Sequence, residues 1–136
     1  MNNGLRKIEL LAPAKNLECG IAAIDHGADA VYIGAAQFGA RQTAGNSTED
    51  IAELTRYAHQ FGAAVYVTVN TIVYEKELQA LEHLLRQLVE MGVDAILVQD
   101  MAVLEIYKKL KAEYMMRGYR MPALHASTQT DNRSAD

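Results

Sequence analysis

The fold is decided by three similar stretches: Gly27-Ala-Asp-Ala-Val-Tyr-Ile-Gly34, Gly62-Ala-Ala-Val-Tyr-Val-Thr-Val-Asn70 and Gly92-Val-Asp-Ala-Ile-Leu-Val-Gln-Asp100. Each begins with a glycine, and a run of mostly β-branched and aromatic residues follows after a short gap. Glycine suits the left-handed backbone position just past the end of a helix. The apolar runs lack strict alternation with polar residues, which is typical of strands buried on both faces of a parallel sheet. The repeat therefore predicts three successive helix-to-strand transitions.

Residues with helical spacing fill the segments between these strands. Asn16 is placed to cap the first helix, and Ser47 with Asp50 has the spacing of a capping box for the second, with Asn46 and Glu49 as the alternative frame. The third helix is expected to end at Gly92, and the fourth to run from near Asp100 to near Gly118. The side chains expected to face inward are Leu17, Ile21 and Ile24; Ile51, Leu54, Ala58 and Phe61; Leu78, Leu81, Leu85 and Leu88; and Val103, Ile106 (or Tyr107) and Leu110.

A leading strand at 8–11 and a closing strand at 123–126 complete an alternation of five strands and four helices. Strict alternation indicates an α/β fold with a parallel sheet and right-handed crossovers. Open doubly wound sheets and closed barrels both fit this pattern, and the similar length of the units favours the barrel. An eight-unit barrel needs roughly 250 residues. We therefore expect residues 1–136 to form the N-terminal portion of one partial TIM-type (β/α) barrel domain, with the remainder of the barrel absent.

An incomplete barrel has two consequences for association. Its first and last strands leave unpaired edges, which natural proteins avoid. Its apolar inner face also lacks the other half. The expected partners are therefore the missing C-terminal half of the barrel and, for the isolated chain, a second copy of itself.

The composition excludes several classes of protein. Half of the 136 residues are hydrophobic and 22% are charged, which is ordinary for a globular domain, and the net charge of −4 gives no overall basic signal for nucleic acid or membrane. Cys19 is the single cysteine, so it forms no internal disulfide and no thiolate metal site by itself. Because the sequence contains no long apolar segment, we expect a cytoplasmic protein with no membrane partner.

Polar side chains follow the predicted strands at the end where a barrel carries its active site. The alternative is that strand ends are loops, and that loops are polar in any case. The residues selected as site candidates by their position are Arg41, Asn70, Gln99, Asp100, His125, Ser127 and Gln129.

Two of these positions leave a second interpretation open. Arg41 lies in the glycine-rich segment 34–47, where its guanidinium could bind a phosphate or carboxylate; the alternative is a flexible surface loop. The glycine spacing matches neither the dinucleotide fingerprint nor the P-loop. Asp100 could hold an electrophile or a ribose hydroxyl, and it also occupies the position of a helix N-cap.

The histidines and the cysteine are assigned by position. His125 ends a strand at the active face, so we expect it to be functional. His26, His59 and His83 fall in helices and are expected to be structural or solvated. Cys19 is expected to be a small packing residue within the first helix. The sequence contains neither a His-Glu-x-x-His helix nor a Gly-x-Ser-x-Gly elbow, so these residues alone do not indicate a protease.

Several motifs together resemble the peptidase U32 family. They keep the family's order and cover nearly the whole chain. The motifs are Glu9-Leu-Leu-Ala-Pro-Ala-Lys-Asn16, Gly27-Ala-Asp-Ala-Val-Tyr-Ile-Gly34, Phe38-Gly-Ala-Arg41, Val98-Gln-Asp-Met101 and His125-Ala-Ser-Thr-Gln129.

This resemblance implies a barrel enzyme acting on ribosomal RNA or on a peptide. The first activity is a prephenate-dependent, oxygen-independent hydroxylation of cytidine, and the second is the older peptidase assignment. Hydroxylating members are similar in carrying an iron–sulfur cluster on cysteines beyond this region, whereas this chain has Thr130 where relatives commonly have cysteine. We expect no cofactor or metal in this chain itself.

The site interpretation combines position with resemblance. His125 and Asp100 are the expected catalytic residues, and the expected substrate-binding residues are Arg41, Asn70, Gln99, Ser127 and Gln129. The alternative is a non-catalytic module that binds a small anion or a partner protein through the same face.

Overall fold

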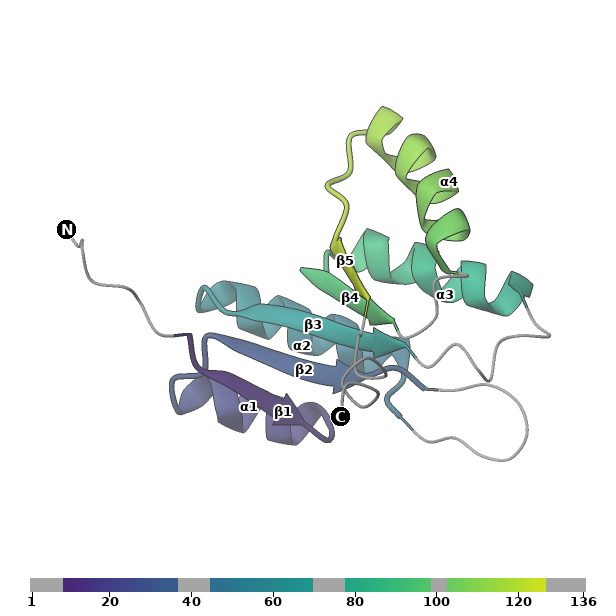
Figure 1. Cartoon of the computed structure of the whole chain (residues 1–136). Coiled ribbons are helices and arrows are strands. Elements are labelled where there is room, and N and C mark those ends of the chain that lie inside the picture. The colour runs from purple at the N-terminus through teal and green to yellow at the C-terminus, as the bar shows by residue number, and fades with distance from the viewer. Residues whose placement is uncertain (1–8, 37–44, 70–77, 99–102, 127–136) are drawn as a thin grey trace, which may run out of the picture.

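The computed structural model describes residues 9–36, 45–69, 78–98 and 103–126, and strands and helices alternate along them (Figure 1). The elements in chain order are β1 (Leu11–Ala14), α1 (Leu17–Asp25), β2 (Ala30–Gly34), α2 (Thr48–Gln60), β3 (Ala64–Val69), α3 (Leu78–Met91), β4 (Ala95–Val98), α4 (Val103–Met116) and β5 (Ala123–Ala126). The predicted alternation of five strands and four helices is confirmed for these residues.

The five strands form one parallel sheet in the order β1-β2-β3-β4-β5. Each strand therefore pairs with the next one along the chain. An open doubly wound sheet reverses its strand order at a switch point, and this sheet has no such reversal. The sequential order is the one found in a TIM-type barrel. The structure thus favours a partial barrel over an open doubly wound sheet, the alternative that also fits the sequence pattern.

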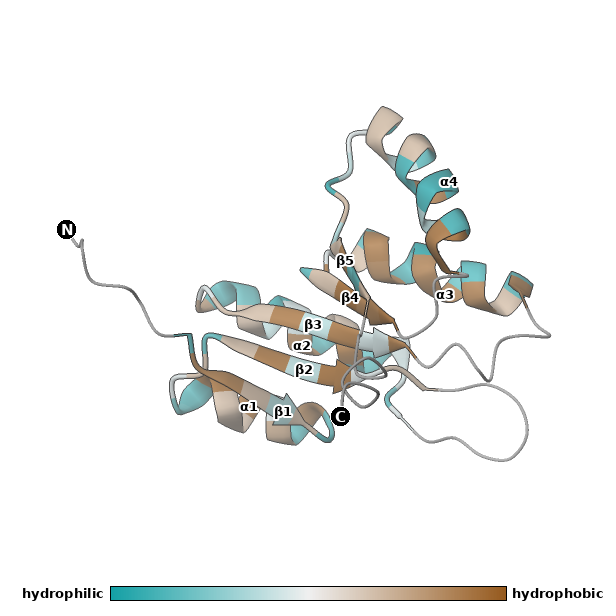
Figure 2. Cartoon of the chain, in the orientation of Figure 1, coloured by the Kyte–Doolittle hydropathy of each residue, from teal (hydrophilic) through white to brown (hydrophobic). Residues whose placement is uncertain are grey.

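One face of the sheet carries the hydrophobic core. Val31 and Ile33 of β2, Val65 and Val67 of β3 and Ile96 of β4 are at most 1% exposed. Their side chains share a cluster with the inward-facing residues of the helices, among them Leu54, Leu85, Leu88 and Leu110. Figure 2 shows the result, with apolar strands and helices that are polar on the side away from the sheet. Burial of this face is the main stabilising force of the fold.

The opposite face of the sheet is not covered by any described element. Its side chains come from the alternate positions of the strands. The larger ones are half-buried or exposed, as at Tyr32, Tyr66, Leu97 and His125, whereas Ala30 and Ala95 at the strand starts are buried. The rings of Tyr32 and Tyr66 lie on neighbouring strands and meet edge to face, with centroids 5.9 Å apart. In a closed barrel these positions point into the interior. We call this the open face.

The helix ends follow the predicted capping chemistry. The Asn16 side chain accepts a hydrogen bond from the Cys19 N–H at 2.8 Å, and Ser47 accepts one from Asp50 at 3.1 Å. The Ser47 frame is therefore correct, and the alternative frame is wrong. The glycines that follow the four helices, Gly27, Gly62, Gly92 and Gly118, all have a positive φ, which other residues rarely adopt.

Three predictions made for residues at the ends of elements are wrong. Strand β1 begins at Leu11 and continues to Ala14, later than the predicted 8–11. Phe61 is 62% exposed because α2 ends at Gln60 and Phe61 is its C-cap. Leu78 is 58% exposed as the first residue of α3. Helical periodicity holds only inside a helix, so it misplaces residues where the helix begins or ends.

Among the described residues, the longest helices have 14 residues. None of these helices is both long enough and apolar enough to cross a membrane.

Candidate functional site

The structure describes one of the seven predicted site residues, His125. The other six lie outside the described residues and stay predictions: Arg41, Asn70, Gln99, Asp100, Ser127 and Gln129. The site is therefore built from the parts of the strand ends that the structure does describe.

His125 is the third residue of β5 and is exposed on the open face. One row of residues in register crosses the sheet at this level. It consists of His125 in β5, Leu97 in β4, Thr68 in β3 and Gly34 in β2. Residues in register on parallel strands point to the same side of the sheet, so the His125 ring and the Thr68 hydroxyl share the open face. The histidine thus points toward what would be the barrel interior, near its carboxyl end.

A pocket of about 370 Å³ lies at the carboxyl ends of β1, β2 and β3. Two small residues at strand ends, Ala14 and Gly34, leave room for it. A Cβ at Gly34 would lie 3.3 Å from the Thr68 hydroxyl, so glycine keeps that hydroxyl accessible. The residues that line the pocket are Pro13, Ala14, Lys15, Cys19, Tyr32, Ile33, Gly34 and Thr68.

Four of the lining residues have polar side-chain groups: Lys15, Cys19, Tyr32 and Thr68. Within the described residues, no side-chain hydrogen bond or ion pair ties any of them to another part of the chain. Polar groups that the fold does not use, gathered around one cavity, are typical of a ligand site. Sequence reasoning missed this group because the strands had first to be placed side by side.

Cys19 is a correction to the sequence interpretation. It is exposed rather than packed in the core. It occupies the first turn of α1, where Asn16 caps its backbone N–H. The buried side of α1 carries Gly20 and Ile24 instead.

Ala36 and Asn46, on either side of the long segment after β2, are hydrogen-bonded to each other at the carboxyl end of β2. Asn46 N–H donates to Gly34 O at 2.9 Å, and Ala36 N–H donates to Asn46 O at 2.8 Å. The buried Asn46 side chain also donates to the carbonyls of Lys15 and Gly34, at 3.2 and 3.0 Å. Asn46 thereby joins the ends of β1 and β2 beside the pocket. This role was missed, although Gly45-Asn46 directly before a helix cap is a recognisable turn signal.

A tight approach at Gly45 fixes the base of this segment. Its φ is +106°, and a Cβ there would lie 2.4 Å from the Ala35 carbonyl oxygen. Only glycine fits such a position. Both ends of the segment that contains Arg41 are therefore anchored at the carboxyl end of β2.

His125 and the pocket are neighbours but do not coincide. His125 is two strands away from Thr68, the nearest pocket residue in the register. Adjacent strands are spaced by about 4.8 Å, which puts the two backbones roughly 10 Å apart. The open face between them is occupied by Leu97.

The remaining histidines have the structural or solvated roles that were predicted. The His26 ring bonds to the Ala22 carbonyl at 2.8 Å, and His83 is exposed on α3. His59 Nε2 lies 2.8 Å from Asp94 Oδ2, at the opposite end of the strands from the pocket. That end of a barrel serves stability rather than catalysis.

Metal ligands do not gather in the described part of the chain, where no group of three or more His, Cys, Asp or Glu side chains could hold an ion. An iron–sulfur cluster does not fit the residues of this chain, because such clusters are usually held by four cysteine thiolates and the sequence has only Cys19.

Comparison with known proteins identifies relatives along almost all of the sequence. The chain is 46% identical to the 23S rRNA 5-hydroxycytidine C2501 synthase of Escherichia coli (strain K12) over 132 residues, which cover 96% of this chain and 18% of that protein. It is 41% identical to the tRNA hydroxylation protein P1 of Bacillus subtilis (strain 168) over 106 residues, 77% of this chain and 25% of that protein.

A collagenase of Porphyromonas gingivalis (strain ATCC BAA-308 / W83) is 27% identical over 130 residues, 94% of this chain and 29% of that protein. The chain thus spans less than a third of the length of each of these three relatives. The sequence model of peptidase family U32 matches residues 15–136. This chain belongs to peptidase family U32.

Proposed function

We propose that this chain supplies the first five strands of the barrel of an RNA-hydroxylating enzyme, and that the RNA is ribosomal and the base a cytidine. The observation that carries the proposal is the 46% identity to the 23S rRNA 5-hydroxycytidine C2501 synthase over 96% of the chain. The geometry is compatible with it, since the pocket and His125 lie toward the carboxyl ends of parallel strands, where barrel enzymes carry out their chemistry.

Hydroxylation is preferred to peptide hydrolysis for two reasons. A relative named for RNA hydroxylation shares 46% identity over 96% of the chain, whereas relatives named as proteases share 40% over 76% of the chain and 27% over 94%. The sequence also lacks the metalloprotease helix and the serine elbow. Within the described residues, no histidine is hydrogen-bonded to Cys19, so the pairing that activates a cysteine nucleophile has no support.

The finer part of the proposal concerns the co-substrate and the cofactor. The family resemblance implies prephenate as the co-substrate and an iron–sulfur cluster in the complete enzyme. Because this chain has a single cysteine, the cluster ligands belong to a part of the enzyme outside these 136 residues. This chain contributes binding and positioning groups from its strand ends.

The open face supports the proposal that further strands complete the domain. It exposes Leu11, at 39%, and leaves Tyr32, Tyr66 and Leu97 half-buried, which suits the interior of a closed barrel better than a surface in water. We propose that the rest of a longer polypeptide covers this face, and that the isolated chain acts on no substrate alone.

A chimera tests the proposed function. The matching 132 residues of the E. coli synthase are replaced by those of this chain, and the gene is expressed in a strain that lacks the synthase. Mass spectrometry of the ribosomal RNA is expected to show 5-hydroxycytidine at C2501, and withdrawal of prephenate is expected to abolish it. A soluble chimera at normal abundance that leaves C2501 unmodified would refute the proposal. Transfer RNA from the same cells is analysed in parallel, and hydroxylation confined to it would refute the ribosomal substrate.

A further inference from the structure

We propose that the pocket at the carboxyl ends of β1, β2 and β3 receives a single pyrimidine nucleotide that has left the base stack of the RNA. The inference rests on the proposed function and names the part of the substrate that these strands bind. Enzymes that act on a base inside folded nucleic acid commonly extrude it into a pocket, where stacking and hydrogen bonds read it. The pocket volume of about 370 Å³ lies at the lower end of the usual range for small-molecule sites, roughly 300 to 1,000 Å³.

Tyr32 supplies the stacking surface. Its ring is half-buried and lines the pocket, and Tyr66 on the next strand meets it edge to face at 5.9 Å. This contact holds the Tyr32 ring in one orientation before a base arrives. The pocket lining also includes Pro13, which is exposed and adds apolar surface. An aromatic ring beside an apolar wall is the arrangement on which single bases stack in RNA-binding proteins.

Thr68 and Lys15 supply the polar contacts. The Thr68 hydroxyl can donate to or accept from the edge of a base, and Gly34 keeps it accessible. Lys15 carries the one formal charge among the lining residues, which suits a phosphate. The Tyr32 ring thus suits the face of a small base, the Thr68 hydroxyl suits the edge of that base, and the Lys15 ammonium suits the phosphate.

Nucleotide titration tests the pocket directly. Cytidine monophosphate, adenosine monophosphate and inorganic phosphate are titrated separately into the chain and into the chimera, with calorimetry and with the amide signals of Gly34 and Thr68 as readouts. We expect saturable binding of cytidine monophosphate that shifts both amides, weaker binding of adenosine monophosphate, and no matching response to phosphate. Phosphate binding as tightly as cytidine monophosphate would overturn the inference, and so would equal affinity for both nucleotides.

Variants separate stacking from charge. Tyr32→Ala is expected to weaken binding of cytidine monophosphate about tenfold, in the range measured for lost base stacking, whereas Tyr32→Phe should bind normally. Lys15→Gln should weaken binding, and Lys108→Gln, the same change at an exposed position of α4, should not. If Tyr32→Ala fails to fold, the affinity of Thr68→Val, a change at an exposed position, tests the pocket independently. Unchanged affinity in both Thr68→Val and Lys15→Gln would refute the assignment.

The outcomes distinguish this inference from the proposed function. If the Tyr32→Phe and Tyr32→Ala chimeras hydroxylate C2501 with the same KM, that result supports the proposed function and refutes the pocket assignment. Binding of cytidine monophosphate by a chimera that leaves C2501 unmodified keeps the pocket and removes the function.

Discussion

The carboxylate of Asp94 accepts a hydrogen bond from the Val65 N–H at 2.8 Å, while the Asp94 N–H donates to the Val65 carbonyl at 2.9 Å. The same two-bond link joins Asp29 to Leu10 in the first of the three repeats, at 2.8 Å in each bond. The second repeat has Ala64 at the position of the aspartate. The aspartate in each Gly-x-Asp motif therefore fastens the start of its strand to the start of the preceding strand. This explains in physical terms why the motif recurs in the sequence.

Asp94→Ala is expected to destabilise the fold by about 1–3 kcal/mol, because it leaves the Val65 N–H without its partner. It also removes the acceptor for His59 and Arg120, at 2.8 and 3.4 Å. The midpoint of urea unfolding at fixed protein concentration measures the effect. Glu105→Ala, which removes an exposed acid from α4, is the control. Equal midpoints for the two variants would contradict the role given to Asp94.

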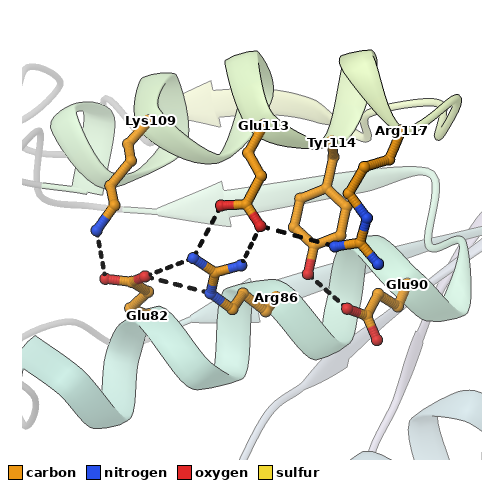
Figure 3. Close-up of polar contacts among 7 residues, drawn as sticks. All are labelled: Glu82, Arg86, Glu90, Lys109, Glu113, Tyr114 and Arg117. Atoms are coloured by element: carbon orange, nitrogen blue, oxygen red, sulfur yellow. Dashed lines mark hydrogen bonds and ion pairs between the residues drawn. The ribbon is translucent and has the colours of Figure 1, made fainter.

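The outer layer is held by a network of charges between α3 and α4 (Figure 3). Arg86 binds Glu113 through two nitrogens at 2.8 and 3.0 Å, and it also reaches Glu82 at 2.9 Å. Lys109 adds a contact to Glu82 at 3.1 Å. Hydrogen bonds from Arg86 are the main cause of a lowered pKa at both Glu82 and Glu113.

The direction of these shifts predicts a pH dependence. Since the pKa of each carboxyl is lower in the folded chain than its ordinary value of 4.5, the unfolded chain binds protons first as the pH falls. The stability contributed by the network is present above about pH 4.5 and is lost as the pH falls through the folded values. Arg86→Gln should therefore lower the unfolding midpoint at pH 7 more than at pH 3. The effect is modest, because these side chains are partly exposed.

Arg56→Gln is the matched control for the network. Arg56 is exposed on α2, and within the described residues it makes no ion pair. Its replacement should change the midpoint little at either pH. A loss in Arg86→Gln that is the same at pH 7 and pH 3 would show that packing of the arginine, rather than its charge, stabilises the α3–α4 contact.

Local features of the fold were predictable from the sequence, and features that depend on register were not. Asn16, Ser47 and the glycines after the helices act within one turn of the chain, so their roles can be read from their neighbours. The grouping of Lys15 with Thr68 depends on which strands are adjacent and in what register. Periodicity cannot supply that information, and this is why the pocket was missed.

His125 is the described residue whose replacement should affect catalysis most. In the chimera, His125→Ala is expected to lower the rate of C2501 hydroxylation by roughly 100-fold or more, the usual loss when a general acid or base is removed. His83→Ala, at an exposed position of α3, should leave the rate unchanged. A His125→Ala chimera with the normal rate would remove this residue from the site.

Arg41→Ala tests the segment whose two ends are anchored at β2. If Arg41 binds the substrate through its charge, its loss should raise KM by roughly 10-fold to 100-fold, which corresponds to the free energy that a charged hydrogen bond contributes. The change in kcat should be smaller. Initial rates over a range of RNA concentrations separate the two constants. A change in kcat alone would show that Arg41 has a role other than binding.

The open face predicts self-association of the isolated chain. Leu97 and Tyr66 are half-buried on this face, and within the described residues nothing pairs with the outer edges of β1 and β5. Sedimentation velocity should therefore show species larger than a monomer that increase with concentration. Leu97→Glu should reduce them, because a carboxylate in the centre of the contact is costly to bury. Ala112→Glu, which places the same side chain on the exposed side of α4, should not. A wild-type chain that remains monomeric at every concentration and unfolds cooperatively would show that the open face is stable in water.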